Sequence, residues 1–221
     1  PVVEKKEKEA RKGLQEKAAV KKTLMATSDN HFRDVDEYNR RGESSDMTLE
    51  DIAAKQKNAG LASQKYEEAI YFDSRCTPAY LKYADIYKSA NAGLAIEKLN
   101  QLKTLEPSNT AIDKKLAEIY YLKNDFSKAA DAYSRFAMGP TANEEDLVKY
   151  AFALFLNHDF AKSLEVANMG LKKNPRHAAF NRLAMYNNTD LKRFEEALKA
   201  ADVFFNECDK ADYSYLDYMY Y

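Results

Sequence analysis

A small residue recurs along the middle of the chain at intervals of 33 or 34 residues, and this recurrence limits the fold more than any other feature. The first series is Ala84, Ala117, Ala151 and Ala184. A second series follows it at intervals of 34 residues: Ala95, Ala129, Ser163 and Ala197. Two small residues in each period predict a pair of closely packed helices, because small side chains let two helix backbones approach without a clash.

Polar segments divide each period into two halves. The segments LKNDF, LNHDF and DLKRF, at 122–126, 156–160 and 190–194, interrupt the apolar pattern before an aromatic residue, as turns do. Pro107, Pro140 and Pro175 mark the ends of periods. Only 6 glycines and 5 prolines occur in 221 residues, fewer than the turns of a β-sandwich or a doubly wound α/β fold require. We therefore predict an all-α fold.

The repeated segment resembles the tetratricopeptide repeat (TPR) family, a helix-turn-helix unit of 34 residues. The two small series match its small positions, Tyr133 matches the aromatic of its second helix, and Pro107 and Pro175 match its closing proline. Departures are confined to the turns near 91–93 and 188–190 and to Pro140, which comes one place early. The resemblance implies an α-solenoid of antiparallel helix pairs, coiled as a right-handed superhelix.

The expected organisation has five parts. Residues 1–26 form a charged helix, 27–47 a polar loop or linker, and 48–76 a degenerate first repeat. Four repeats follow at about 77–109, 110–143, 144–176 and 177–209, and residues 210–221 begin a further repeat helix. Because this last helix would be cut short, the sequence suggests a fragment of a longer repeat protein.

Composition argues against several classes of function. The 34 basic and 35 acidic residues cancel to a net charge of −1, so we expect no nucleic-acid partner. Cys76 and Cys208 lack a CxxC spacing, and the three histidines have no ligand or nucleophile partner at helical spacing, so we predict no catalytic residue, metal or cofactor. No apolar run is long enough to span a membrane and the first residues are no signal peptide; we expect a soluble chain, cytoplasmic or periplasmic.

The resemblance implies that the first helices of the repeats line a concave groove for a protein or peptide. The inward positions are Leu81, Asp85, Lys114, Glu118, Tyr121, Val148, Phe152, Phe155, Asn181 and Met185. Val148, Phe152 and Phe155 add a second apolar face to one helix. Two explanations remain open: burial by neighbouring helices, or an apolar pocket for a partner. The charged pattern with which some members of the family grip chaperone tails is absent, since Leu81 and Asp85 stand at its first positions.

Two functions fit these features. The first is a non-enzymatic scaffold that binds a protein or peptide in the groove. The alternative is a structural module that assembles by end-to-end stacking of repeats, within a larger protein or a homo-oligomer. The end of the chain, ADYSYLDYMYY, favours self-association, because the last unit of a solenoid needs a polar outer face to stay soluble and this one is rich in tyrosine.

Overall fold

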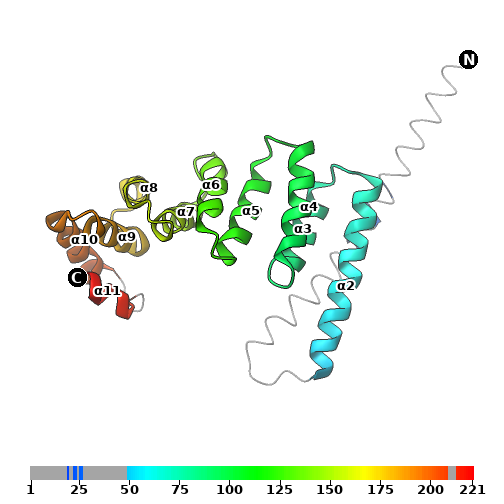
Figure 1. Cartoon of the computed structure of the whole chain (residues 1–221), viewed down its shortest axis with the longest axis horizontal. Coiled ribbons are helices and arrows are strands. Elements are labelled where there is room, and N and C mark those ends of the chain that lie inside the picture. The colour runs from blue at the N-terminus through cyan, green and yellow to red at the C-terminus, as the bar shows by residue number, and fades with distance from the viewer. Residues whose placement is uncertain (1–18, 20–21, 24, 27–48, 209–212) are drawn as a thin grey trace, which may run out of the picture. The chain divides into compact units, whose positions relative to one another are not determined.

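The computed structural model describes residues 19, 22–23, 25–26, 49–208 and 213–221 (Figure 1). These residues form helices and turns without a strand, and the described helices, α2 to α11, pack largely as consecutive pairs. The chain divides into two compact units, Pro1–Ser108 and Asn109–Tyr221. The predicted fold class, an all-α array of helix pairs, is confirmed.

The first unit contains α2 (Leu49–Phe72), α3 (Thr77–Tyr87) and α4 (Ala92–Leu105). Helix α2 runs for 24 residues without a break, so a single helix stands where the degenerate repeat predicts a helix pair. The residues that align with the turn LKNDF are ASQKY at 62–66, which lack both the Asn that takes the positive φ and the Asp that caps the next helix. Tyr83 and Tyr87 of α3 bind α2, donating hydrogen bonds to Glu67 and Ser63 at 3.2 Å each.

The second unit contains three full helix pairs and a short helix. The pairs are α5 (Thr110–Leu122) with α6 (Phe126–Phe136), α7 (Glu144–Leu156) with α8 (Phe160–Lys173), and α9 (Ala178–Asp190) with α10 (Phe194–Glu207). The short helix α11 (Tyr215–Tyr220) follows. Each pair packs on the next, α6 against α7 and α8 against α9, while α11 packs on α9.

Three turns of the second unit repeat the same backbone conformation. Asn124, His158 and Lys192 all have φ near 60°, and they lie 34 residues apart. The residue after each turn begins a helix: the carboxylates of Asp125 and Asp159 accept hydrogen bonds from the backbone N–H groups of Lys128 and Lys162. The recurring segments LKNDF and LNHDF therefore combine a left-handed residue with an N-cap, which reverses the chain in four residues.

The eight small residues of the two series are all buried. Their role is clearest where α7 meets α8: the Oγ atom of Ser163 donates a hydrogen bond of 2.8 Å to the carbonyl oxygen of Ala151. A side-chain hydroxyl reaches the backbone of the neighbouring helix only if the two helices are very close. Small residues at these positions therefore set the distance between the helices of a pair.

Part of the expected organisation lies outside the described residues. Of the charged helix predicted at 1–26, Ala19, Lys22, Thr23, Met25 and Ala26 are described, and all are helical. The linker predicted at 27–47 lies entirely outside. The further helix predicted at 210–221 is described from Tyr213 onward, and α11 lies within it.

Candidate partner-binding surface

Six of the predicted binding residues lie on α5 and α7 of the second unit, and we call this set the A-face. They are Lys114, Glu118, Tyr121, Val148, Phe152 and Phe155, each partly exposed. Leu81 and Asp85 lie on α3 of the first unit, where Asp85 pairs with Lys88 at 3.1 Å.

An ion pair joins the two helices of the A-face. The Nζ atom of Lys114 on α5 lies 2.9 Å from a carboxylate oxygen of Asp146 on α7. Asp146 is almost fully buried, and it also accepts the backbone N–H of Asn143 in the capping box that begins α7. Because this carboxylate serves both the helix start and the neighbouring helix, Lys114 holds α5 and α7 in a defined register.

The polar side chains of the A-face are paired by charge. Glu118 accepts a hydrogen bond from Lys115 at 3.0 Å, and Lys149 lies 2.6 Å from Glu145. The hydrogen bond to Glu145 raises the pKa of Lys149, so this amine stays protonated at neutral pH. Burial raises the pKa of Tyr121, whose hydroxyl stays neutral. Charged side chains of both signs therefore border the A-face.

The apolar part of the A-face comes from α7, and its members differ in their surroundings. Phe155 packs against the rings of Phe160, Tyr186 and Tyr220, with centroid distances of 5.6, 5.5 and 6.4 Å. It therefore belongs to an aromatic cluster that joins α7, α8, α9 and α11. Val148 and Phe152 are partly exposed on the same helix.

The two predicted binding residues of α9 are buried. Met185 has no exposed surface and packs in a core cluster with Tyr186, Ala201 and Phe204. Asn181 is 4% exposed, and its side-chain amide donates hydrogen bonds to the carbonyl oxygens of Pro175 and His177. Helix α9 lies against α7, α8, α10 and α11, which explains this burial. The structure thus brings the A-face residues together but does not add Asn181 or Met185 to them.

Solved structures with the same arrangement of helices exist. One described as "YrrB: a TPR protein with an unusual peptide-binding site" superposes with a TM-score of 0.62 over 76% of this chain and 85% of that one, at 15% identity. Two structures of MamA superpose with TM-scores of 0.61 and 0.58, covering 82% and 73% of this chain and 91% and 95% of theirs, at 15% and 17% identity. No model of a protein family and no curated protein sequence matches the chain.

The chain has the TPR fold. In TPR terms, α5, α7 and α9 are the first helices of their repeats, and α6, α8 and α10 are the second helices. The structure therefore confirms the TPR fold that the spacing of the small residues predicted.

The contact that docks α11 on the last TPR pair was not foreseen from the sequence. Asp217 is fully buried and accepts hydrogen bonds from Arg182 Nε at 2.7 Å, Arg182 Nη2 at 3.1 Å and the Tyr186 hydroxyl at 2.6 Å. Ser214 and Asp217 form a capping box, as Asn143 and Asp146 do at α7. The Ser-x-x-Asp spacing before an apolar run is the sequence signal that could have predicted the start of α11.

We expect Asp217→Asn to weaken the docking of α11 by about 1–3 kcal/mol at neutral pH, because it leaves buried donors of Arg182 and Tyr186 without a charged acceptor. Burial acts to raise the pKa of Asp217, but the hydrogen bonds from Arg182, Tyr186 and Ser214 outweigh it and hold the pKa below 3.8. The charge of Asp217 therefore stabilises the docked α11 at pH values above about 3.8, and this stabilisation is lost as the pH falls through the folded-state pKa of Asp217.

Thermal unfolding of the Asp217→Asn variant and the wild type, followed from pH 7 towards pH 3 by near-ultraviolet circular dichroism, measures this effect. The gap in stability between the two proteins should narrow as the pH falls. A gap that stays constant or widens would show that the charge of Asp217 does not stabilise the docked helix.

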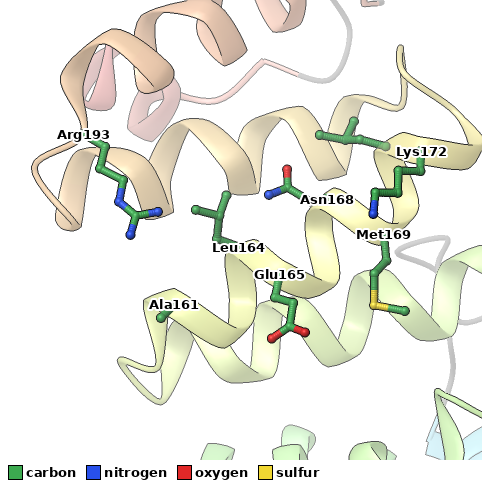
Figure 2. A pocket seen from close by; sticks show the side chains of 8 residues that line it. Ala161, Leu164, Glu165, Asn168, Met169, Lys172 and Arg193 are labelled. Carbon is green, nitrogen blue, oxygen red and sulfur yellow. The ribbon is translucent and has the colours of Figure 1, made fainter.

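A cavity of about 710 Å³ lies along α8, the second helix of its TPR pair (Figure 2). Leu164, Asn168 and Lys172 of α8 line it at helical spacing, and Arg193, at the start of α10, lines its other side. It shares no residue with the A-face. Polar, apolar and charged side chains alternate in its lining.

The described part of the chain holds no group of three or more His, Cys, Asp or Glu side chains arranged to bind a metal ion. None of the helices in the described part of the chain has the length and hydropathy that a membrane span requires.

Proposed function

We propose that this chain is a non-enzymatic scaffold that binds a protein or peptide through the A-face. The observation that carries the proposal is that partly exposed Val148 and Phe152 lie beside charged side chains of both signs on the same two helices. An apolar centre with a charged edge is the usual composition of a protein-binding surface, since burial of the centre supplies affinity and the edge supplies specificity. The TPR fold and the peptide-binding site named for YrrB support this reading.

Phe152 is the residue whose replacement best tests this proposal. Phe155 packs in the aromatic cluster with Tyr186 and Tyr220, so its replacement would disturb the core together with any binding surface. Phe152 lies one turn earlier on the same helix. We expect Phe152→Ser to preserve the helical circular dichroism spectrum and to weaken partner binding about 30-fold, the loss that corresponds to an aromatic hot spot of about 2 kcal/mol.

A peptide library displayed on phage and selected against the 221-residue chain provides the ligand. The affinity of selected peptides is then measured for the wild type, for Phe152→Ser and for Met138→Ser, a control in which an apolar residue of 57% exposure outside the A-face is replaced. Of the two variants, only Phe152→Ser should bind the peptides more weakly than the wild type does. If no peptide is selected, or if Phe152→Ser binds as the wild type does, the A-face is not the binding surface.

A further inference from the structure

The cavity of about 710 Å³ along α8 shares no residue with the A-face, and we call it the α8 groove. Its lining includes Leu164, Glu165, Asn168, Met169 and Lys172 of α8 and, from the turn before α10, Arg193. In Figure 2, Arg193 and Lys172 lie at the two ends, and Leu164 and Asn168 lie between them. Binding pockets in proteins have volumes of about 300–1,000 Å³, and the α8 groove falls within this range.

The centre of the α8 groove is largely apolar. Leu164 is 7% exposed, and Met169 and Leu171, which also line the groove, are partly exposed. Leu164, Asn168 and Leu171 recur at a spacing of four and three residues, so they lie along one side of α8. An apolar side chain of a partner would therefore be removed from water on this strip, which favours its binding.

Two cations border this apolar strip without a partner in the described part of the chain. No hydrogen bond or ion pair there engages the side chain of Lys172 or Arg193. By contrast, the Nζ atom of Lys162, on the same helix, lies 3.1 Å from a carboxylate oxygen of Asp159. Because Lys172 and Arg193 have no ion pair to break, a carboxylate of a partner can reach either of them directly.

The repeat pattern does not explain these two cations. Arg193 stands where the two preceding pairs have the capping residues Asp125 and Asp159, and Lys172 stands 34 residues after Met138. The side chain of Arg193 makes no capping hydrogen bond, so the start of α10 lacks a contact that α6 and α8 possess. The positive charge at both ends therefore belongs to this groove and not to the architecture of the repeat.

The spacing of the two cations suggests the form of the partner. Lys172 lies eight residues after Leu164, about 12 Å along α8, and Arg193 lies at the other end of the groove (Figure 2). In an extended peptide, residues i, i+2 and i+4 point to the same side, and residues i and i+4 lie about 13 Å apart. Acidic residues at i and i+4 with an apolar residue at i+2 therefore match the two cations and the apolar strip.

Glu165 favours such a peptide over a continuous polyanion. Its carboxylate lines the same groove and has no ion pair in the described part of the chain. A nucleic acid carries a phosphate at every nucleotide, so Glu165 would repel it between the two cations. A peptide carries carboxylates only at the two ends of the motif, and its backbone N–H groups can donate to Glu165.

We propose that the α8 groove binds an extended acidic segment of a partner protein. The segment has an apolar residue with an aspartate or glutamate two positions away on each side. This site lies on a second helix of a TPR pair, is separate from the A-face and goes beyond the scaffold function proposed for that face.

A random peptide library displayed on phage, selected against the 221-residue chain carrying Phe152→Ser, tests the proposal. This substitution leaves the α8 groove unchanged and disfavours ligands of the A-face. The selected peptides should be enriched in the motif of two acidic residues flanking an apolar one. Their affinity for the wild type should fall as the salt concentration rises, because salt screens the attraction between exposed charges.

Charge reversal at the two ends of the groove then locates the bound peptides. Lys172→Glu and Arg193→Asp should each weaken their binding at least about tenfold, because repulsion replaces attraction. Arg193→Asp introduces the capping residue of the two preceding turns, so it should not weaken the start of α10. Lys173→Glu is the matched control: it makes the same change of charge in the last turn of α8, at a residue outside the lining, and should weaken binding less than about twofold.

Peptides with either acidic residue changed to lysine provide a test of the pairing itself. One of the two should bind Lys172→Glu more tightly than it binds the wild type. The proposal is overturned if no peptide is selected, if the selected peptides lack the acidic motif, or if Lys172→Glu and Lys173→Glu have equal effects. Competition by an oligothymidylate that depends on Lys172 and Arg193 would also overturn it and indicate a nucleic-acid site. Because these peptides should bind the wild type and Phe152→Ser alike, the α8 groove and the A-face can fail separately.

Discussion

Replacement of Ala151 by arginine is expected to lower the free energy of unfolding by about 4 kcal/mol or more. Ala151 has no exposed surface, and its carbonyl oxygen accepts the hydroxyl of Ser163 from the facing helix. An arginine here adds the strain of overpacking, about 1–3 kcal/mol, to the cost of removing a charge from water. The distance between α7 and α8 cannot widen without loss of the Ser163 hydrogen bond.

Denaturant titration followed by far-ultraviolet circular dichroism measures this loss. The control is Ala111→Arg, which places the same side chain on an exposed position of α5 and should change stability by no more than about 0.5 kcal/mol. Similar unfolding midpoints for the two variants would show that the small residues do not set the packing of the helix pairs.

Gly170→Ala is expected to destabilise the chain by about 2–3 kcal/mol, although alanine usually stabilises a helix relative to glycine. A Cβ atom at Gly170 of α8 would lie 2.1 Å from the ring of Phe180 on α9, far inside contact distance. Phe180 is fully buried beside the ring of His177, so its ring has little room to move. Gly170 is therefore the residue that lets α8 and α9 approach.

A matched variant separates this clash from helix propensity. Gly60 lies within α2, and a Cβ atom there would meet no atom within 4 Å, so Gly60→Ala should stabilise the chain by about 0.5–1 kcal/mol. Thermal melts of both variants should move in opposite directions. Combining Gly170→Ala with Phe180→Leu should recover part of the loss, because the smaller side chain relieves the contact. A stabilising Gly170→Ala would contradict the close approach of α8 and α9.

These contacts suggest how the second unit remains in register. Two of the three steps along its first helices, α5 to α7 and α9 to α11, rely on a buried aspartate from a capping box, Asp146 or Asp217, that pairs with a cation on the previous first helix. Burial makes such a pair specific, because a shifted register would leave the carboxylate in an apolar environment without a partner. A register held in this way keeps the A-face in a fixed position on the second unit.

The sequence by itself determined the fold class. Small residues repeat at 33 or 34 residues and polar turns divide each period, and both are local patterns that fix helix starts, helix ends and the closest contacts between neighbours. The same reasoning identified Val148 and Phe152 as apolar residues outside the packing set of α7, and the structure leaves them partly exposed.

Tertiary structure alone decided which of the other candidate residues remain at the surface. Met185 and Phe155 occupy positions like those of exposed residues on other helices, but the neighbours of α9, including Tyr220 of α11, enclose Met185 and pack on Phe155. The physical reason is that a repeat pattern specifies which face of a helix is apolar, whereas exposure depends on how many helices distant in sequence pack against that face.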